Sequence, residues 1–196
     1  IYLTEPIDEM TMQNIAKFEG KAVTDAGKEA NLDMSDDEKA DQRKKNEDME
    51  GFRMWMKSVL QERITKVEVS TRLVNSPATI VQSEYGVSPS MQKYLKAQAV
   101  ADNDRDSQFA NVFNQAVLEI NPSHTIIKNL RAMQQANPDS PEARETVELV
   151  FNTAALAAGY VLDNAADYSQ MVVKMMSKMA SGGNPGAVLS SDHSTV

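Results

Sequence analysis

The spacing of hydrophobic positions predicts helices interspersed with three short strands. Apolar side chains recur every three or four residues over 49–60, which is the period of an amphipathic helix. Residues 64–69 alternate apolar and polar side chains, as in a strand with one buried face. Two further apolar runs, 79–81 and 117–120, predict two more strands. Because Asn-Ser-Pro at 75–77 has turn chemistry, we expect the first two strands to pair as neighbours.

Serine, asparagine and proline mark the positions where three later helices are expected to begin. Ser-Pro at 88–89 supplies an N-cap and a first helical residue, and Asn-Pro at 121–122 repeats this arrangement. Asp-Ser-Pro at 139–141 predicts the start of a helix that runs to Gly159. A last helix is expected over 165–180, so the domain ends in a helical hairpin.

The N-terminal region and the end of the chain complete the predicted organisation. Asp8 is expected to cap a helix that ends at Gly20, because glycine suits a helix C-terminus. Residues 24–47 carry many charges and few apolar side chains, which predicts a charged linker or a mobile helix. Residues 48–180 form the predicted domain, and residues 181–196, rich in Gly and Ser, form a disordered tail. The predicted fold class is α+β, with a small three-stranded sheet packed with helices.

Composition and charge exclude several classes of function. The net charge is −8, and the first 50 residues hold 14 acidic against 7 basic side chains. Neither half of the chain offers a basic surface for phosphate groups, so we expect no nucleic-acid partner. The longest apolar stretch is well short of the ~20 residues that a membrane span needs, so we expect no membrane insertion. The absence of cysteine excludes disulfides, thiolate nucleophiles and zinc–thiolate sites.

The motifs that could carry chemistry are incomplete. His193 lies in the predicted tail, and His124 follows Asn-Pro-Ser at a helix start, where we expect a capping role. No Gly-x-Ser-x-Gly elbow accompanies either histidine. The acidic run that begins at Asp102 resembles a calcium loop, but Ser107 occupies the glycine position and Phe113 the glutamate position. We therefore expect no catalytic residue, no metal site and no cofactor in this chain.

The last two predicted helices carry more apolar surface than a monomer needs. Residues 149–158 are apolar around almost the whole helix, and the helix over 165–180 has a wide methionine-rich stripe. One interpretation is that both helices pack within their own domain. The other is a symmetric dimer in which two such hairpins form a four-helix bundle. The residues expected at that interface are Leu149, Ala155, Leu156, Tyr168, Val172, Met175, Met176 and Met179.

The helix predicted over 88–99 carries a smaller apolar stripe. Met91, Tyr94 and Leu95 are neighbours on its surface, and Lys93 and Lys96 lie elsewhere on the helix. On pattern alone this stripe either docks on the domain's own sheet or remains exposed for a partner.

At this point the sequence resembles the C-terminal part of heat-shock protein 90 chaperones. The resemblance includes the stretch Leu-Glu-Ile-Asn-Pro-Ser-His and, later, Thr-Ala-Ala-Leu followed by Gly-Tyr. The matching segments occur in order at residues 1–9, 18–21, 67–73, 76–77, 85–86, 91, 96–99, 118–124, 153–156 and 159–160. The series in register is more specific than any one of its members.

The resemblance implies a C-terminal dimerisation domain of an ATP-driven folding chaperone, with residues 1–23 leading in from a middle domain. ATP and Mg²⁺ would bind an N-terminal domain that is absent from this sequence. The implied partners are a second copy of the chain, partly folded client proteins and co-chaperones. The implied client-contacting residues are Val87, Met91, Tyr94 and Leu95.

The sequence departs from the family pattern in three places. Val87 stands where family members often have Trp, and Pro89 and Ser90 replace a small residue and Asn.

The chain begins at Ile1, so we expect a fragment. It ends in neither Met-Glu-Glu-Val-Asp nor Lys-Asp-Glu-Leu. If Val196 is the natural end, the resemblance points to a mitochondrial or plastid member, with a cytoplasmic one as the alternative.

The rival function is a stand-alone structural dimerisation or scaffold domain without client binding. An exposed apolar stripe on residues 87–99 would discriminate between the two, because a scaffold has no need to leave it in solvent.

Overall fold

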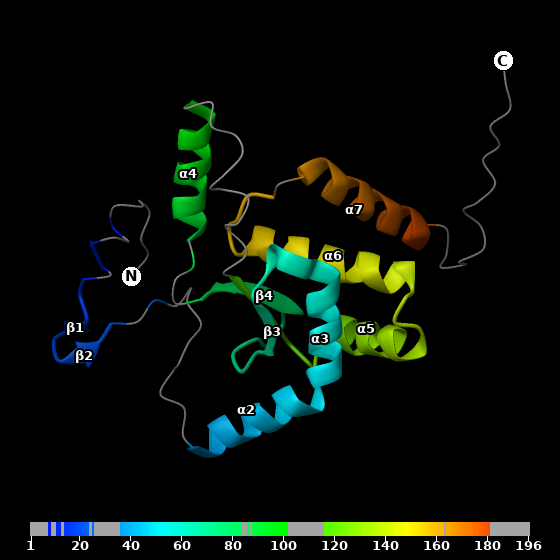
Figure 1. The fold of residues 1–196 in the computed structure, drawn as a ribbon, viewed down its shortest axis with the longest axis horizontal. Helices are drawn as coiled ribbons and strands as arrows, with labels where there is room; N and C mark the ends of the chain where they lie inside the picture. Colours follow the sequence, from blue (N-terminus) through cyan, green and yellow to red (C-terminus); the bar gives the residue numbers. More distant parts are fainter. Residues whose placement is uncertain are drawn as a thin grey trace, which may run out of the picture. The chain divides into compact units, whose positions relative to one another are not determined.

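The computed structural model describes residues 8, 11–12, 14–23, 25, 36–83, 86, 88–101, 116–162 and 164–180. The chain divides into two compact units, Ile1–Val161 and Leu162–Val196, and the second contains α7 (Ala165–Ala180). The first unit contains β1 (Lys17–Phe18), β2 (Lys21–Ala22), α2 (Asp36–Asp48), α3 (Glu50–Leu60), a 3₁₀ turn (Gln61–Arg63), β3 (Lys66–Val69), β4 (Ala78–Gln82), α4 (Pro89–Ala101), β5 (Ala116–Ile120), α5 (Thr125–Ala136) and α6 (Pro141–Ala157) (Figure 1).

Three of the strands form one sheet in the order β3-β5-β4, which confirms the predicted α+β class. Strand β5 pairs parallel with β3 and antiparallel with β4, so Leu118 lies opposite both Val67 and Ile80. All five residues of β5 are buried, so both faces of this central strand are covered. The prediction that the first two strands pair directly is wrong. The most apolar strand, β5, takes the central position between them, where burial is greatest.

Helices α3, α5 and α6 enclose the core beside this sheet (Figure 1). Helix α3 buries Phe52, Met56 and Leu60, which recur every four residues as the sequence predicted. Helix α6 contacts β4, α3 and α5, and its Phe151 is fully buried. The Arg63 guanidinium lies 4.3 Å from the centre of the Phe151 ring. Arg63 also donates to Glu148 and to Asn152 Oδ1, so one cation joins the 3₁₀ turn to α6.

The capping signals are confirmed at two helices and shifted at a third. The Ser88 hydroxyl accepts from Met91 N (3.1 Å) and the Ser140 hydroxyl from Ala143 N (3.4 Å). The helix expected to begin at 121–122 instead begins at Thr125, with His124 Nδ1 accepting from Ile126 N (3.2 Å). The reason is that the Asn121 side chain accepts from Ser123 N (3.0 Å), which makes a local turn.

The N-terminal segment differs most from its prediction. Residues Lys17–Phe18 and Lys21–Ala22 form an antiparallel hairpin, although Asp8 and residues 11–12 are helical. Glu19 and Gly20 both have positive φ, 48° and 79°, which is typical of the two-residue turn that joins such strands. The predicted helix is therefore present at Asp8 and residues 11–12, but its predicted end at Gly20 is wrong, because the glycine serves a hairpin turn.

The charged segment contains the helix α2, which joins the edge of the sheet. Asn46 Oδ1 accepts from Val69 N (3.0 Å) on β3 and from the Arg53 guanidinium. The backbone donor at the edge of β3 is thereby paired. Residues 24 and 26–35 of the predicted linker and the predicted tail at 181–196 lie outside the described residues.

Candidate functional site

The methionine-rich stripe predicted near the C-terminus lies on α7. Helix α7 buries none of its side chains, and Tyr168 and Val172 are half-buried. Three methionines in the same stripe, Met175, Met176 and Met179, are exposed. They follow Tyr168 at intervals of 7, 8 and 11 residues, which places them on one side of a helix. A helix whose apolar stripe remains exposed is typical of an interaction surface.

The predicted interface residues on α6 have different environments. Leu149 is half-buried and Leu156 is exposed. Ala155 is 0% exposed in the single chain, and Ala154, Phe151 and Val150 on the same helix are also buried. The interior of the unit therefore accounts for much of the apolar coverage of this helix, and Ala155 has no accessible surface to offer a partner.

The stripe on α4 is partly accessible. Tyr94 is 53% exposed, whereas Met91 and Leu95 are half-buried. Lys93 is exposed beside Tyr94. Val87, the fourth predicted client-contacting residue, lies outside the described residues. The described part of α4 therefore presents one large amphipathic ring and the edges of two aliphatic side chains.

Among the described side chains of α4, the most buried one is polar and was not singled out from the sequence. Gln92 is 0% exposed, and its amide bonds to the backbone of Val161. Glutamine is usually a surface residue, so the hydrophobic pattern gave no signal for it. In the sequence, Gln92 is connected with the candidate surface only because it follows Met91 directly in a helix with strong start signals.

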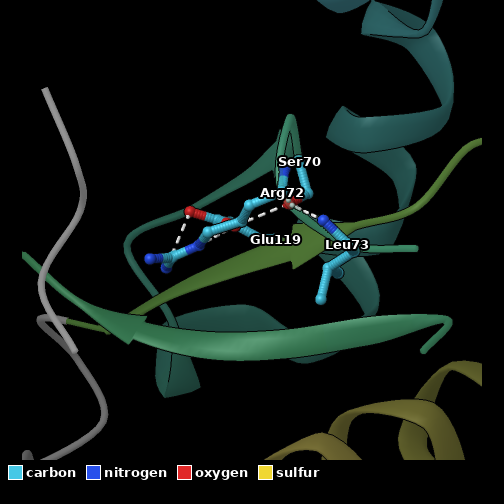
Figure 2. Close-up of polar contacts among 4 residues, drawn as sticks. All are labelled: Ser70, Arg72, Leu73 and Glu119. Carbon is cyan, nitrogen blue, oxygen red and sulfur yellow. Dashed lines mark hydrogen bonds and ion pairs between the residues drawn. The ribbon is translucent and has the colours of Figure 1, made fainter. Parts of the chain in front are cut away.

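A second polar cluster fixes the turn after β3 to the central strand (Figure 2). The Glu119 carboxylate accepts from the Ser70 hydroxyl (2.8 Å), from Arg72 Nε (3.0 Å) and from Arg72 Nη2 (3.2 Å). The Ser70 hydroxyl in turn accepts from the backbone N–H groups of Arg72 (3.3 Å) and Leu73 (3.2 Å). Because every charge in this cluster is paired, its geometry is that of a structural ion pair.

A cavity of about 380 Å³ lies beside this turn, and its lining is mixed in character. The lining residues are Arg72, Leu73, Thr79, Ile80, Val81, Gln82, Pro89, Ala158 and Tyr160. The cavity therefore adjoins both the outer strand β4 and the first turn of α4.

The residues considered for catalysis are not assembled into a site. His124 caps α5, as expected, while His193 and the acidic run 102–113 lie outside the described residues. Within the ranges that the structure describes, no three His, Cys, Asp or Glu side chains are grouped so that they could hold a metal ion. The helices of those ranges are also too short or too polar to cross a membrane.

Comparison with known proteins gives a consistent family. The family model described as Hsp90 protein matches residues 1–195. The chain is 35% identical over its whole length to heat shock protein 90-5, chloroplastic, of Arabidopsis thaliana. It is also 35% identical, over 90% of its length, to putative heat shock protein HSP 90-beta-3 of Homo sapiens. It is 34% identical, over 91% of its length, to the endoplasmin homolog of Hordeum vulgare.

These matches cover 24%, 29% and 21% of the three relatives, so the chain spans about a quarter of their length. The match to the family model extends over nearly all of the 196 residues, and it agrees with the resemblance found from the sequence motifs. The chain belongs to the Hsp90 protein family.

Proposed function

We propose that this chain is the C-terminal homodimerising and client-contacting domain of a chaperone of the Hsp90 family. The observation that carries the proposal is the helix α7, which buries no side chain and leaves a row of methionines exposed. An apolar stripe of this kind is stabilised when a second copy of the helix covers it. Family membership supports the chaperone part of the proposal.

The proposed dimer interface is narrower than the set expected from the sequence. In the second unit it consists of the α7 stripe; on α6 of the first unit Leu156 is exposed and Leu149 half-buried, whereas Ala155 is buried. The α7 stripe comprises Tyr168, Val172, Met175, Met176 and Met179. Two such hairpins would meet in a four-helix bundle with twofold symmetry.

Helix α4 is the proposed client surface. Its exposed Tyr94 and half-buried Met91 and Leu95 offer an aromatic ring and flexible aliphatic groups. Methionine adapts to partners of different shape, which suits the varied surfaces of partly folded proteins. The discriminating feature against a plain scaffold is this accessible stripe, because a scaffold gains nothing from it.

The remaining parts of the proposal concern the whole protein. ATP and Mg²⁺ would be bound outside this chain, which itself would neither hydrolyse ATP nor hold a cofactor. Co-chaperones are proposed as further partners. One relative is named as chloroplastic, a second as mitochondrial and a third as an endoplasmin homolog. These names support an organellar location for this protein.

The test measures both activities in the same samples. Sedimentation velocity of the chain at micromolar concentration should give the mass of a dimer. A permanently unfolded probe, reduced and carboxymethylated α-lactalbumin, should bind the chain in a pull-down and in fluorescence anisotropy.

Changing Met91, Tyr94 and Leu95 together to Ser should weaken capture of the probe and leave the dimer mass unchanged. Circular dichroism checks that the triple variant remains folded. A monomer at every concentration would contradict the dimer. Unchanged capture by the triple variant would contradict the client surface and favour the scaffold.

A further inference from the structure

Helix α4 is attached to the body of its unit through its first turn. Ser88, which caps the helix, is buried, and its carbonyl accepts from Gln92 N (2.8 Å). Pro89 lies next to Gly159 at the end of α6: a Cβ added to this glycine would lie 3.5 Å from Pro89 Cβ. The start of the helix therefore contacts a segment of the chain that is about seventy residues later in the sequence.

The side chain of Gln92 makes the most specific part of this attachment. Its Oε1 accepts from Val161 N (3.0 Å), and its Nε2 donates to Val161 O (3.4 Å). One amide thus pairs with both backbone groups of a single residue, in the manner of a neighbouring strand. A buried amide is costly without partners, so this pair specifies one docked position of the helix more strictly than an apolar contact would.

The segment that receives Gln92 is itself fixed. Helix α6 ends at Ala157, and Gly159, two residues later, has a φ of 90°, in the left-handed region that favours glycine. Gly159 N donates to Leu156 O (2.9 Å), and Tyr160 N donates to Ala155 O (2.9 Å). Val161 follows directly, so its backbone groups are presented by a turn with a defined geometry.

The position of Gln92 determines which side of α4 remains accessible. Successive residues of an α-helix are rotated by about 100°, so a residue two positions later lies roughly opposite. With Gln92 directed into the unit, Tyr94 is directed away from it, in agreement with the 0% and 53% exposure of the two side chains. Met91 and Leu95, one turn apart, lie together on one side of the helix between these two directions and are half-buried.

We propose that Gln92 is a positioning residue for the client surface: its amide pair with Val161 holds α4 in the orientation that presents Tyr94. This rests on the proposed function of α4 as a client surface. The same pair links that surface to the end of α6, immediately before the segment that leads to α7. Gln92 itself contacts no client.

The test is Gln92→Met, which keeps the length of the side chain and removes both hydrogen bonds. Gln135→Met is the matched control, because it makes the same chemical change at an exposed position of α5. Hydrogen–deuterium exchange of the full chain should show roughly tenfold faster exchange in residues 90–95 and at Val161 of Gln92→Met. Exchange in β5 should stay at the wild-type rate, because the core of the unit is unaltered.

Capture of the unfolded α-lactalbumin probe should weaken roughly threefold to tenfold, because the stripe is no longer pre-organised. Wild-type exchange rates at 90–95 and Val161 in Gln92→Met would overturn the proposal. Acceleration that extends to β5 would also overturn it, by showing that Gln92 is an ordinary core residue. Local acceleration with undiminished capture would refute the positioning role.

If the wild-type chain captures no probe, the client function fails by itself and the positioning role fails with it. The exchange pattern would then still establish whether the Gln92–Val161 pair docks the helix. The two failures are thus distinguishable in one set of measurements.

Discussion

Replacing Met176 and Met179 of α7 with Ser should convert the proposed dimer into monomers at micromolar concentration. These side chains are 60% and 72% exposed in the single chain, so most of their surface is available to a partner. Complete burial of a methionine side chain contributes about 1.5–3 kcal/mol. The exposed portion of each therefore contributes about 1–2 kcal/mol when it is covered.

The symmetry of the proposed dimer doubles this effect, because each protomer contributes the same surface. The double variant should thus lose at least about 4 kcal/mol of association free energy, which raises the dissociation constant roughly a thousandfold. Sedimentation equilibrium from nanomolar to hundred-micromolar protein measures that constant directly.

Two controls separate loss of the interface from other effects. Met54→Ser removes a methionine that is 64% exposed on α3, outside the proposed interface. Gln170→Ser imposes a serine on the polar side of α7, so it reports any loss of helix propensity. Both controls should remain dimeric. The reasoning is refuted if the double variant dimerises like the wild type, or if either control dissociates as readily as the double variant.

Three further predictions concern stability and are measured by urea unfolding. Arg72→Leu should lower the free energy of unfolding by about 2–3 kcal/mol, because it leaves the nearly buried Glu119 carboxylate without its cation. Adding Glu119→Leu should restore part of that loss. An unchanged free energy of unfolding in Arg72→Leu would contradict the structural role of the pair. Gly159→Ala should cost about 1–2 kcal/mol through its φ of 90°, since the space beside it is adequate; an unchanged midpoint would show that the turn relaxes. Leu118→Ala should cost about 3–4 kcal/mol at the centre of the sheet, whereas Val74→Ala, at an exposed site, should stay within about 0.5 kcal/mol.

The positions of most helices and strands followed from the sequence because their signals are local. The four-residue spacing of Phe52, Met56 and Leu60 was sufficient for α3, and Ser140 with Pro141 was sufficient for the start of α6. The family also followed from short segments in order along the chain, which the match over residues 1–195 confirmed. The stripe on α7 was visible for the same reason, since helix periodicity alone aligns its methionines.

Only the tertiary structure decided which surfaces are covered and which strands are neighbours. The order of strands in a sheet depends on contacts between segments that are far apart in the sequence. Strand β5 lies between β3 and β4, although the local turn signal at 75–77 favoured direct pairing of β3 with β4.

The burial of Ala155 and Gln92 could not be predicted for a related physical reason. The periodicity of a helix shows which residues share a side, but it does not show what packs there. The sequence pattern alone allowed Ala155 to lie at a dimer interface, but its side chain is buried in the single chain. Gln92 was a polar residue in an amphipathic helix, and its role appeared only when folding brought the backbone of Val161, sixty-nine residues away, within hydrogen-bonding distance of its amide.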